Sequence, residues 1–269
     1  MSSLQKVLIA NRGEIAIRIA RAASTLSIAT VGVYSKADAQ GLHTRHVDVA
    51  VELSGTDPVS AYLNVEEIVQ IAADNECDCI HPGYGFLSEN ANLAQQCAKR
   101  GIKFVGPAAE TLALFGDKVS ARTLAENLDI PVIAGEAIAS AEEAIEVAAC
   151  IGFPVMVKAT AGGGGRGMRS VTAADQVAEA FDRCQSEAQA AFGDGSLFIE
   201  KLIIRPRHIE VQVLADEAGN AIHLRERDCS IQQRHQKVVE IAPAPNLDPE
   251  LRDQMLADAL KLVKGSDYT

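Results

Sequence analysis

Hydrophobic and polar positions along the first 115 residues follow two alternating patterns, which predict strands and helices in turn. Short apolar runs with the length of buried strands occur at 6–10, 30–34, 47–53, 77–82 and 102–106. Helical spacing of apolar residues separates them, over 13–26, from 64 to about 75 and from 88 to about 101. This alternation is typical of a doubly wound α/β unit with a parallel sheet, and we expect the unit to close near Phe115.

Polar residues before the apolar runs predict where the helices begin. Asn64, with Glu67 three residues later, predicts an N-terminal capping box. Ser88 is expected to cap the helix that ends at Gly101. The helix over 13–26 is expected to bury one face, formed by Ile15, Ile19, Ala22 and Leu26.

From residue 116 onward the pattern changes, and it predicts an α+β domain with antiparallel strands. Helical patterns cover 117–129, 140–152 and about 173–190, and strand patterns cover 153–159, 168–171, 196–203, 207–216 and 221–230. Residues 217–220 predict the turn of a hairpin. Asp248 as N-cap and Pro249 at the first helical position predict a final helix to about Gly265. We therefore expect a Rossmann-like domain over 1–115 and a second domain over 116–269.

The composition narrows the range of functions. The 269 residues carry a formal net charge of −11, with 4% aromatic residues and no Trp. Such a chain argues against nucleic acid and anionic membranes as general partners, and no apolar run approaches the ~18 residues of a membrane span. The six cysteines lack zinc-ligand spacing and predict free thiols in a reducing compartment, so we expect a cytoplasmic protein.

A glycine-rich stretch, KATAGGGGRGMRSV at 158–171, stands between two predicted strands. Gly162, Gly164 and Gly167 satisfy the Gly-x-Gly-x-x-Gly spacing, but a dinucleotide fingerprint needs a helix next, where this chain continues as a strand. The Gly-Lys-Ser/Thr end of a phosphate-binding P-loop is missing as well. The pattern favours a strand–loop–strand lid that closes over phosphates, and the alternative is a hairpin without a ligand.

Charged residues near this stretch are candidates for an anion site, although each has a simpler explanation. Lys158 ends the strand before the loop, where it could equally be solvated, and Lys118 opens a helix, where a lysine opposes the helix dipole. A mixed run of charged and polar residues covers 225–237. A solvated strand is the simpler explanation of such a run, but its composition suits a polar site better. His208 fits a packed or capping histidine equally well.

Taken together, these motifs resemble biotin carboxylase, the ATP-grasp component of biotin-dependent carboxylases. The similarity runs from Lys6 onward through KVLIANRGEIAIRI, IHPGYGFLSENA, FVGP, GDKVSA, KATAGGGGRGMR, RPRHIEVQVLAD and ERDCSIQQRHQKVVEIAPAP. The resemblance implies a pre-ATP-grasp domain over 1–115 and an ATP-grasp domain over 116–269 that is truncated at its C-terminal side. Ile241 departs from the pattern, since many relatives carry an acidic residue there.

The resemblance also implies roles for individual positions. Lys118 and Lys158 are expected to contact nucleotide phosphates, and Gly164 and Gly165 to lie in the lid over them. Lys237 is expected to bind bicarbonate. The other nucleotide contacts that the resemblance implies are Glu200, Lys201, Leu202, Ile203, His208, Gln232 and His235.

The implied reaction begins with bicarbonate attacking the γ-phosphoryl group of ATP, which gives carboxyphosphate and ADP. CO2 then passes to the ureido nitrogen of biotin. The resemblance implies ATP, Mg²⁺ or Mn²⁺ and carrier-bound biotin as cofactors and substrates, and a biotin carboxyl carrier, a carboxyltransferase and a homo-oligomer as partners. Phosphoryl transfer depends on positioning and positive charge, and a closing lid excludes water. The favoured type is the α subunit of an acetyl-, propionyl- or methylcrotonyl-CoA carboxylase, with pyruvate or urea as other acceptors.

The resemblance further implies what this chain can do by itself. The family's metal-binding carboxylates are expected beyond Thr269, so we expect no metal ligand within this chain and a fragment that is inactive alone. One alternative is a non-catalytic ATP-binding fragment. Another is a different ATP-grasp ligase, such as the carbamoyl phosphate synthetase type, against which the segments HPGYGFLSEN and RHQKVVE argue.

Overall fold

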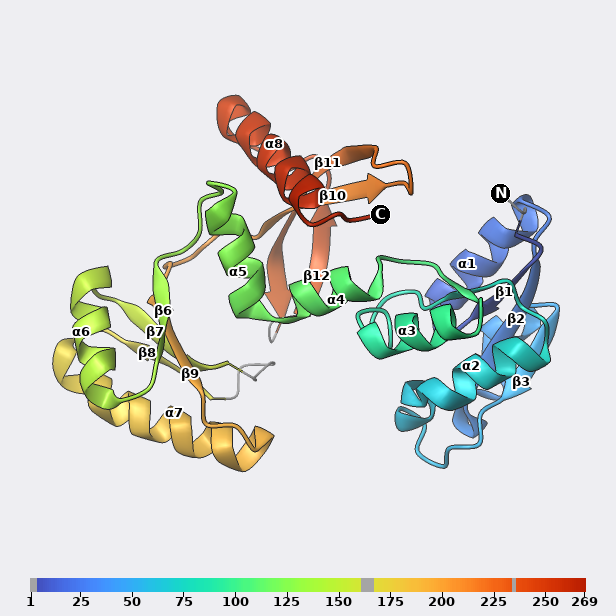
Figure 1. Ribbon diagram of the computed structural model, residues 1–269, viewed down its shortest axis with the longest axis horizontal. Coiled ribbons are helices and arrows are strands. Elements are labelled where there is room, and N and C mark those ends of the chain that lie inside the picture. The colour runs from blue at the N-terminus through green and yellow to red at the C-terminus, as the bar shows by residue number, and fades with distance from the viewer. Residues whose placement is uncertain (1–3, 161–166, 234–235) are drawn as a thin grey trace. The chain divides into compact units, whose positions relative to one another are not determined.

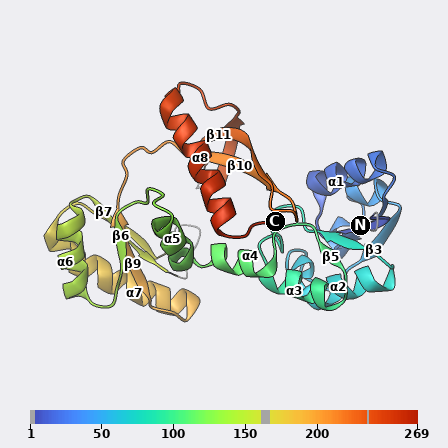
Figure 2. The ribbon, with the colours of Figure 1, turned by 45° about the horizontal axis from the view of Figure 1, so that its top comes forward.

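The computed structural model describes residues 4–160, 167–233 and 236–269 (Figures 1 and 2). The chain divides into two compact units, which are described separately. The first contains Met1–Ala121, Ala215–Asn220 and Ser266–Thr269, and the second contains Arg122–Leu214 and Ala221–Gly265. The domain boundary after residue 115 stays a prediction, and it falls inside helix α4 (Ala109–Gly116).

A parallel sheet forms the centre of the first unit. Its strand order is β3-β2-β1-β4-β5, and each neighbouring pair is parallel. The strands are β1 (Lys6–Ile9), β2 (Ala29–Tyr34), β3 (Val49–Glu52), β4 (Cys79–His81) and β5 (Lys103–Phe104). The helices between them are α1 (Gly13–Thr25), α2 (Val65–Asp74) and α3 (Ala91–Lys99). The doubly wound parallel arrangement predicted from the alternating pattern is therefore confirmed.

Both faces of this sheet are covered, because successive side chains of a strand point to opposite sides. Val7 and Ile9 of β1 pack in one cluster with Ala16 of α1. Leu8, between them, packs in another cluster with Ile68 of α2 and with α3. Helix α1 therefore covers one face, and α2 and α3 cover the other (Figure 1).

The buried face of α1 differs from the predicted one. Its buried residues are Ala16, Ile19, Ala20 and Ala23. Of the residues predicted for this face, Ile19 is buried and Ile15 is half-buried, whereas Ala22 and Leu26 are exposed. Small alanine side chains let the helix lie close to the sheet, and Leu26 comes after the last helical residue as the C-cap.

The predicted caps of α2 and α3 have different outcomes. Asn64 caps α2 as predicted, because its side chain accepts a hydrogen bond from the Glu67 N–H at 3.2 Å. Ser88 does not cap α3. Its N–H donates to the Gly85 carbonyl, so the chain is still turning there, and Asn90 is the N-cap two residues later.

The second unit contains two sheets among its described residues. The first sheet is antiparallel, in the order β6-β9-β7-β8. Its strands are β6 (Gly135–Ile138), β7 (Val155–Ala159), β8 (Met168–Val171) and β9 (Leu197–Lys201). The second sheet has the order β10-β11-β12, with β10 (Ile209–Ala215), β11 (Ala221–Gln233) and β12 (Gln236–Ile241). The helices are α5 (Lys118–Asn127), whose residues up to Ala121 belong to the first unit, α6 (Ala141–Ile151), α7 (Val177–Phe192) and α8 (Pro249–Gly265). The predicted change to antiparallel strands is confirmed.

Burial alternates along β7 and β9 and decides which side chains remain accessible. Val157 of β7 and Ile199 of β9 are fully buried in the core that the sheet forms with α6 and α7. The next residue on each strand, Lys158 and Glu200, therefore projects from the opposite face. This places both side chains on the face away from α6 and α7.

A buried ion pair joins β11 to α8. The Glu226 side chain is 1% exposed and accepts a hydrogen bond from Arg252 Nε at 2.8 Å. The Ala244 N–H, in the connection before α8, donates to the same oxygen at 3.3 Å. Burial pushes the pKa of the Glu226 carboxyl upward, but the hydrogen bond and charge of Arg252 together with backbone hydrogen bonds outweigh it and hold the pKa below its usual value. Since a buried charge needs a partner, this pair fixes α8 on the sheet.

We expect Arg252→Met to lower the free energy of unfolding by about 3 kcal/mol, because Glu226 stays charged and buried without its partner. Urea unfolding followed by circular dichroism measures this loss. Arg183→Ala is the matched control, since it breaks a pair with Glu179 whose side chains are 61% and 67% exposed. The control should cost less than about 0.5 kcal/mol. Equal losses for both variants would show that the Glu226 pair does not hold α8 in place.

Candidate functional site

The strands on either side of the glycine-rich stretch form a hairpin. Strands β7 and β8 pair antiparallel with Lys158 opposite Met168, and the Ala159 N–H donates to the Gly167 carbonyl at 2.9 Å. Gly167 has a φ of +65°, and a Cβ there would lie 3.1 Å from the Ala159 Cβ. A strand therefore follows the glycines, as predicted, where a dinucleotide-binding turn would continue as a helix.

Lys158 is held by an acidic partner on the neighbouring strand. Its Nζ lies 2.6 Å from Glu200 Oε2, and the two side chains are 21% and 22% exposed. The same Nζ lies 5.5 Å from the centre of the Phe198 ring, and the Arg122 guanidinium lies 5.6 Å from it. Two cations thus gather around one aromatic ring on the face away from α6 and α7, and each is also paired with a carboxylate, Glu200 or Glu126.

The end of β9 is fixed by hydrogen bonds to the backbone. Lys201 Nζ donates to the carbonyls of Gly152 at 3.0 Å and Phe153 at 2.8 Å. The Leu202 N–H donates to the Pro154 carbonyl at 3.1 Å. The Lys201 side chain is therefore engaged within the protein, while Ile203 is 46% exposed.

A second polar cluster lies on the sheet of β10, β11 and β12. His208 Nδ1 lies 2.8 Å from Gln232 Nε2, so the residue before β10 contacts the end of β11. Glu210 of β10 binds Arg227 through Oε1 and Lys237 through Oε2. The sheet therefore brings together three predicted site residues, His208, Gln232 and Lys237.

Charge pairing sets the protonation of this cluster. Burial pushes the pKa of the Glu210 carboxyl upward, but the hydrogen bonds from Lys237 and Arg227 outweigh it and lower the pKa. The hydrogen bond to Glu210 in turn raises the pKa of the Lys237 ammonium above its usual value. At neutral pH the cluster therefore holds a carboxylate between two cations.

These residues do not fit a magnesium ion. Glu210, Cys229 and Glu240 each place one potential ligand atom within 4.8 Å of the others. However, the charges of Arg227 and Lys237 already neutralise Glu210 and oppose a further cation. Mg²⁺ also prefers oxygen ligands to a thiol.

A brace at the start of β10 supports the cluster. Arg207 Nη2 lies 2.8 Å from Asp228 Oδ2, and the His208 N–H donates to Ser230 Oγ at 2.9 Å. The Ser230 hydroxyl also donates to Asp228. Hydrogen bonds from Ser230, and then from Arg207, lower the pKa of Asp228 to about 2. This brace holds His208 at a fixed place beside Gln232.

Several predicted residues lie elsewhere or are not described. Lys118 begins α5 and belongs to the first unit, so a phosphate site shared with Lys158 stays a prediction. The nucleotide and bicarbonate roles of the other residues also stay predictions. The predicted residues outside the described part of the chain are Gly164, Gly165 and His235.

Glu210 and Arg227 were not among the predicted site residues. Glu210 had one sequence signal, since it is the only acidic residue in the otherwise apolar or uncharged strand pattern over 209–215. Arg227 stood in the mixed run over 225–237, but nothing in the sequence shows which acid it binds.

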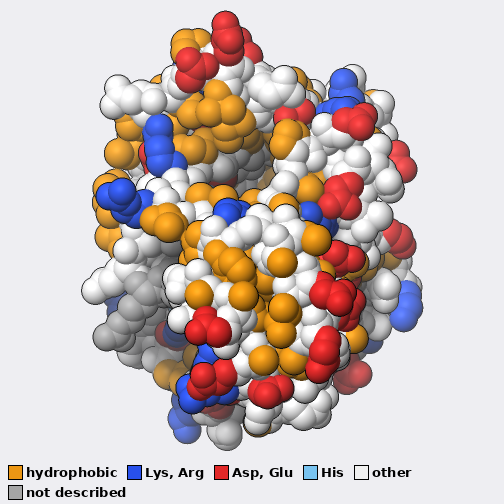
Figure 3. All heavy atoms as spheres, turned by 90° about the vertical axis from the view of Figure 1, so that its left-hand side faces the viewer, with side chains coloured by type: hydrophobic (Ala, Val, Ile, Leu, Met, Phe, Trp, Pro, Cys, Tyr) orange, Lys and Arg blue, Asp and Glu red, His pale blue; other side chains and the backbone are white. Residues whose placement is uncertain are grey.

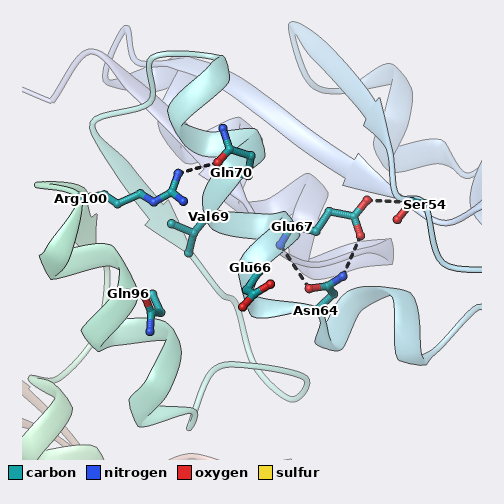
Figure 4. A pocket seen from close by; sticks show the side chains of 8 residues that line it. All are labelled: Ser54, Asn64, Glu66, Glu67, Val69, Gln70, Gln96 and Arg100. Carbon is teal, nitrogen blue, oxygen red and sulfur yellow. Dashed lines mark hydrogen bonds between the residues drawn. The ribbon is translucent and has the colours of Figure 1, made fainter.

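The first unit contains a separate hollow of about 500 Å³ (Figure 4). Its polar side chains bind one another: Arg100 donates to Gln70 at 2.7 Å, and Glu67 accepts from Asn64 and from the Ser54 N–H. None of the predicted site residues that the structure describes lines it. We therefore do not assign the candidate site to this hollow.

The surface as a whole is acidic. Asp and Glu side chains are spread among basic and hydrophobic ones over the face shown in Figure 3, in line with the net charge of −11. Anion binding therefore depends on local cations such as Lys158 and Lys237. No helix in the described part of the chain has the length and apolar character needed to cross a membrane.

Comparison with protein families divides the chain into two matches. Residues 3–112 match the family described as "Biotin carboxylase, N-terminal domain". Residues 117–269 match the family described as "Carbamoyl-phosphate synthase L chain, ATP binding domain".

The curated relatives include several pyruvate carboxylases. The enzyme of Bacillus subtilis (strain 168) is 53% identical over 269 residues, which are 99% of this chain and 23% of the relative. The mitochondrial enzyme of Homo sapiens is 51% identical over 268 residues, which are 98% of this chain and 23% of the relative. The chain thus spans about a quarter of the length of these relatives. These relatives are pyruvate carboxylases, so they do not support the acyl-CoA carboxylase type that the sequence favoured.

Solved structures with the same fold are biotin carboxylases. The biotin carboxylase–β,γ-ATP complex from Campylobacter jejuni has a TM-score of 0.93 and 45% identity, and the match covers 99% of this chain and 60% of that one. The biotin carboxylase domain dimer of Hydrogenobacter thermophilus 2-oxoglutarate carboxylase, in complex with MgADP, ADP and bicarbonate, has a TM-score of 0.92 and 43% identity. That match covers 100% of this chain and 59% of the neighbour.

We expect Ser230→Ala to raise the pKa of Asp228 from about 2 toward its usual value, because the largest stabilising hydrogen bond is lost. A lowered folded-state pKa contributes stability that is present above the unfolded value of about 3.9 and lost as the pH falls toward 2. Carboxyl ¹³C titration measures the shift. Ser196→Ala, which removes the hydroxyl beside Asp194, should leave Asp228 unchanged. An unshifted Asp228 in Ser230→Ala would contradict the brace.

Proposed function

Because the chain belongs to the biotin carboxylase family, with the family's N-terminal domain followed by an ATP-grasp ATP-binding domain, we propose that it takes part in the ATP-dependent carboxylation of biotin by bicarbonate. The observation that carries this proposal is the cluster of Lys237, Gln232 and His208 on one sheet. A neighbouring structure of the same fold contains MgADP and bicarbonate, which supports an anion and nucleotide site.

In the proposed reaction, bicarbonate attacks the γ-phosphoryl group of ATP, and carboxyphosphate and ADP form. CO2 is then transferred to carrier-bound biotin. Transfer of a phosphoryl group needs positioned reactants and positive charge rather than covalent catalysis by the protein. The chain's own contribution would be cationic groups at two places, Lys158 for nucleotide phosphate and Lys237 for bicarbonate.

The pairing of Lys158 with Glu200 supports a nucleotide role for this face. Glu200 keeps the ammonium beside the Phe198 ring at the end of β7, next to the glycine-rich connection. A phosphate that arrives there competes with a partly exposed ion pair, which is worth only about 0–1 kcal/mol. Lys158 can therefore exchange its carboxylate partner for a phosphate at small cost.

Carboxyphosphate must be kept from water, and the pairing of β7 with β8 supports the glycine-rich connection between them as the segment that would do this. Its two strands carry the glycine-rich connection directly after Lys158. We assign Gly164 and Gly165 to a lid over the phosphates, which would exclude water when nucleotide is bound. Magnesium would neutralise the phosphates in the whole enzyme, but the group of Glu210, Cys229 and Glu240 does not fit it, and no step here passes through it.

We assign the chain to the pyruvate carboxylase type rather than to the acyl-CoA type. Identities of 50–53% to curated pyruvate carboxylases over nearly the whole chain support this choice. The partners would then be a biotin carrier domain and a carboxyltransferase domain, together with further copies of the chain. A carbamoyl phosphate synthetase function is not favoured, because residues 3–112 match the biotin carboxylase N-terminal domain.

Two lysine variants of the whole carboxylase that carries this chain test the two proposed anion sites. We expect Lys237→Ala to raise the KM for bicarbonate by at least about 10-fold, since a hydrogen bond from a charged group is worth about 1.5–3 kcal/mol. The KM for ATP should stay within about 2-fold. Lys158→Ala should raise the KM for ATP by at least about 10-fold and leave the KM for bicarbonate within about 2-fold. Bicarbonate-dependent release of ADP measures both constants.

Lys261→Ala, on the exposed side of α8, is the control and should change neither constant. If Lys237→Ala leaves the bicarbonate KM unchanged, the assignment of the cluster to bicarbonate is wrong.

A further inference from the structure

Lys201 is the last residue of β9, and its side chain points toward α6. Its Nζ donates to the carbonyl of Gly152 at 3.0 Å and to that of Phe153 at 2.8 Å. The preceding residue, Glu200, pairs with Lys158 on the opposite face of the sheet. The nucleotide contact that the resemblance implies for Lys201 would then be made by its backbone, and the ammonium has a different role.

The two carbonyls that Lys201 binds lie at the C-terminal end of α6. Gly152 is the C-cap of this helix, and Phe153 follows it. The last carbonyls of a helix lack partners within the helix, and the helix dipole makes this end negative. An ammonium group satisfies both requirements, because it donates to two acceptors and carries a positive charge. Lys201 therefore connects the end of β9 to the end of α6.

Backbone hydrogen bonds fix the same point from both sides. The Lys201 N–H donates to the Ala134 carbonyl, just before β6, at 2.8 Å. The Leu202 N–H donates to the Pro154 carbonyl, just before β7, at 3.1 Å. Beyond this point the chain leaves the sheet, and the next strand, β10, begins at Ile209. Lys201 is thus placed where the sheet last controls the path of the chain.

An open backbone donor follows directly after this point. The Ile203 N–H makes no hydrogen bond within the described residues, and Ile203 is 46% exposed. Small-molecule sites often use a few backbone N–H groups to orient a ligand. A purine base carries acceptor nitrogens on its edge, so it can accept a hydrogen bond from this N–H. The position of the donor depends on how firmly the end of β9 is held.

The side chain of Lys201 can hold this position because it is itself ordered. Ordering a lysine costs more entropy than ordering most side chains. Two hydrogen bonds from a charged donor offset that cost. The contacts are also partly buried, so water competes less for the two carbonyls.

We propose that Lys201 is a positioning residue for the nucleotide base, whose ammonium holds the end of β9 against α6 and thereby places the Ile203 N–H. This inference rests on the proposed function, because it takes the residues after Glu200 as contacts of the ATP base. The Lys201 side chain itself does not contact the nucleotide. Bicarbonate binding at Lys237 does not depend on it, since Lys237 lies on the other sheet.

Lys201→Met tests this role, because methionine keeps an unbranched side chain and removes the ammonium. In the whole carboxylase that carries this chain, we expect the KM for ATP to rise by at least about 5-fold, while the KM for bicarbonate stays within about 2-fold. The preference for ATP over GTP should fall by at least about 3-fold, because N1 of adenine accepts a hydrogen bond and N1 of guanine carries a proton. Bicarbonate-dependent release of ADP and of GDP measures these values.

Two further variants separate positioning from folding. Lys201→Arg keeps a charged donor and should restore most of the preference for ATP. Lys264→Met removes a lysine from the last turn of α8, and this matched control should leave both the ATP KM and the preference unchanged. If Lys201→Met does not fold, Lys201→Gln replaces it with the same loss of preference expected. A merely structural loss lowers the amount of active enzyme, and with it the rate with both nucleotides equally.

The outcomes separate the two proposals. If neither Lys158→Ala nor Lys201→Met changes the ATP KM, the nucleotide assignment of this sheet fails, and the positioning role fails with it. If Lys158→Ala raises the ATP KM but Lys201→Met changes neither the KM nor the preference for ATP, the proposed function stands and the positioning role is overturned. An equal loss with ATP and GTP would also overturn it.

Discussion

The alternation of side chains along a β-strand is the constraint on which the second unit depends. Burying Val157 and Ile199 under α6 and α7 forces Lys158 and Glu200 onto the opposite face of the sheet. The three-stranded sheet obeys the same rule. Its Glu226 turns toward α8, and the next residue, Arg227, contacts the candidate site instead. Packing of apolar residues thus decides where the polar chemistry can be.

Acidic residues on other strands of the same sheet hold the cations of both sheets in place. Lys158 is paired with Glu200, and Lys237 is paired with Glu210. Such pairs add little stability when they are partly exposed. Instead, each pair holds a long and flexible lysine side chain near one position. In an acidic chain, such locally ordered cations give an anion a favourable place to bind.

The sequence predicted the strand–loop–strand character of the glycine-rich stretch, because the apolar pattern resumes at once after Gly167. It also predicted the caps at Asn64 and Asp248, since capping is a local interaction with the next few N–H groups. It was wrong about Ser88, where the preceding turn delays the helix to Asn90. Local signals fail when a neighbouring turn competes for the same residues.

The sequence by itself determined the two kinds of sheet and the helix order, because period, capping and glycine spacing are local properties. Tertiary structure decided that α1 buries alanines rather than Leu26, since close contact with the sheet favours small side chains. It also decided that Glu210 binds Arg227 and Lys237, which are 17 and 27 residues away along the chain. No local pattern specifies such partners, because only the pairing of β10, β11 and β12 brings them together.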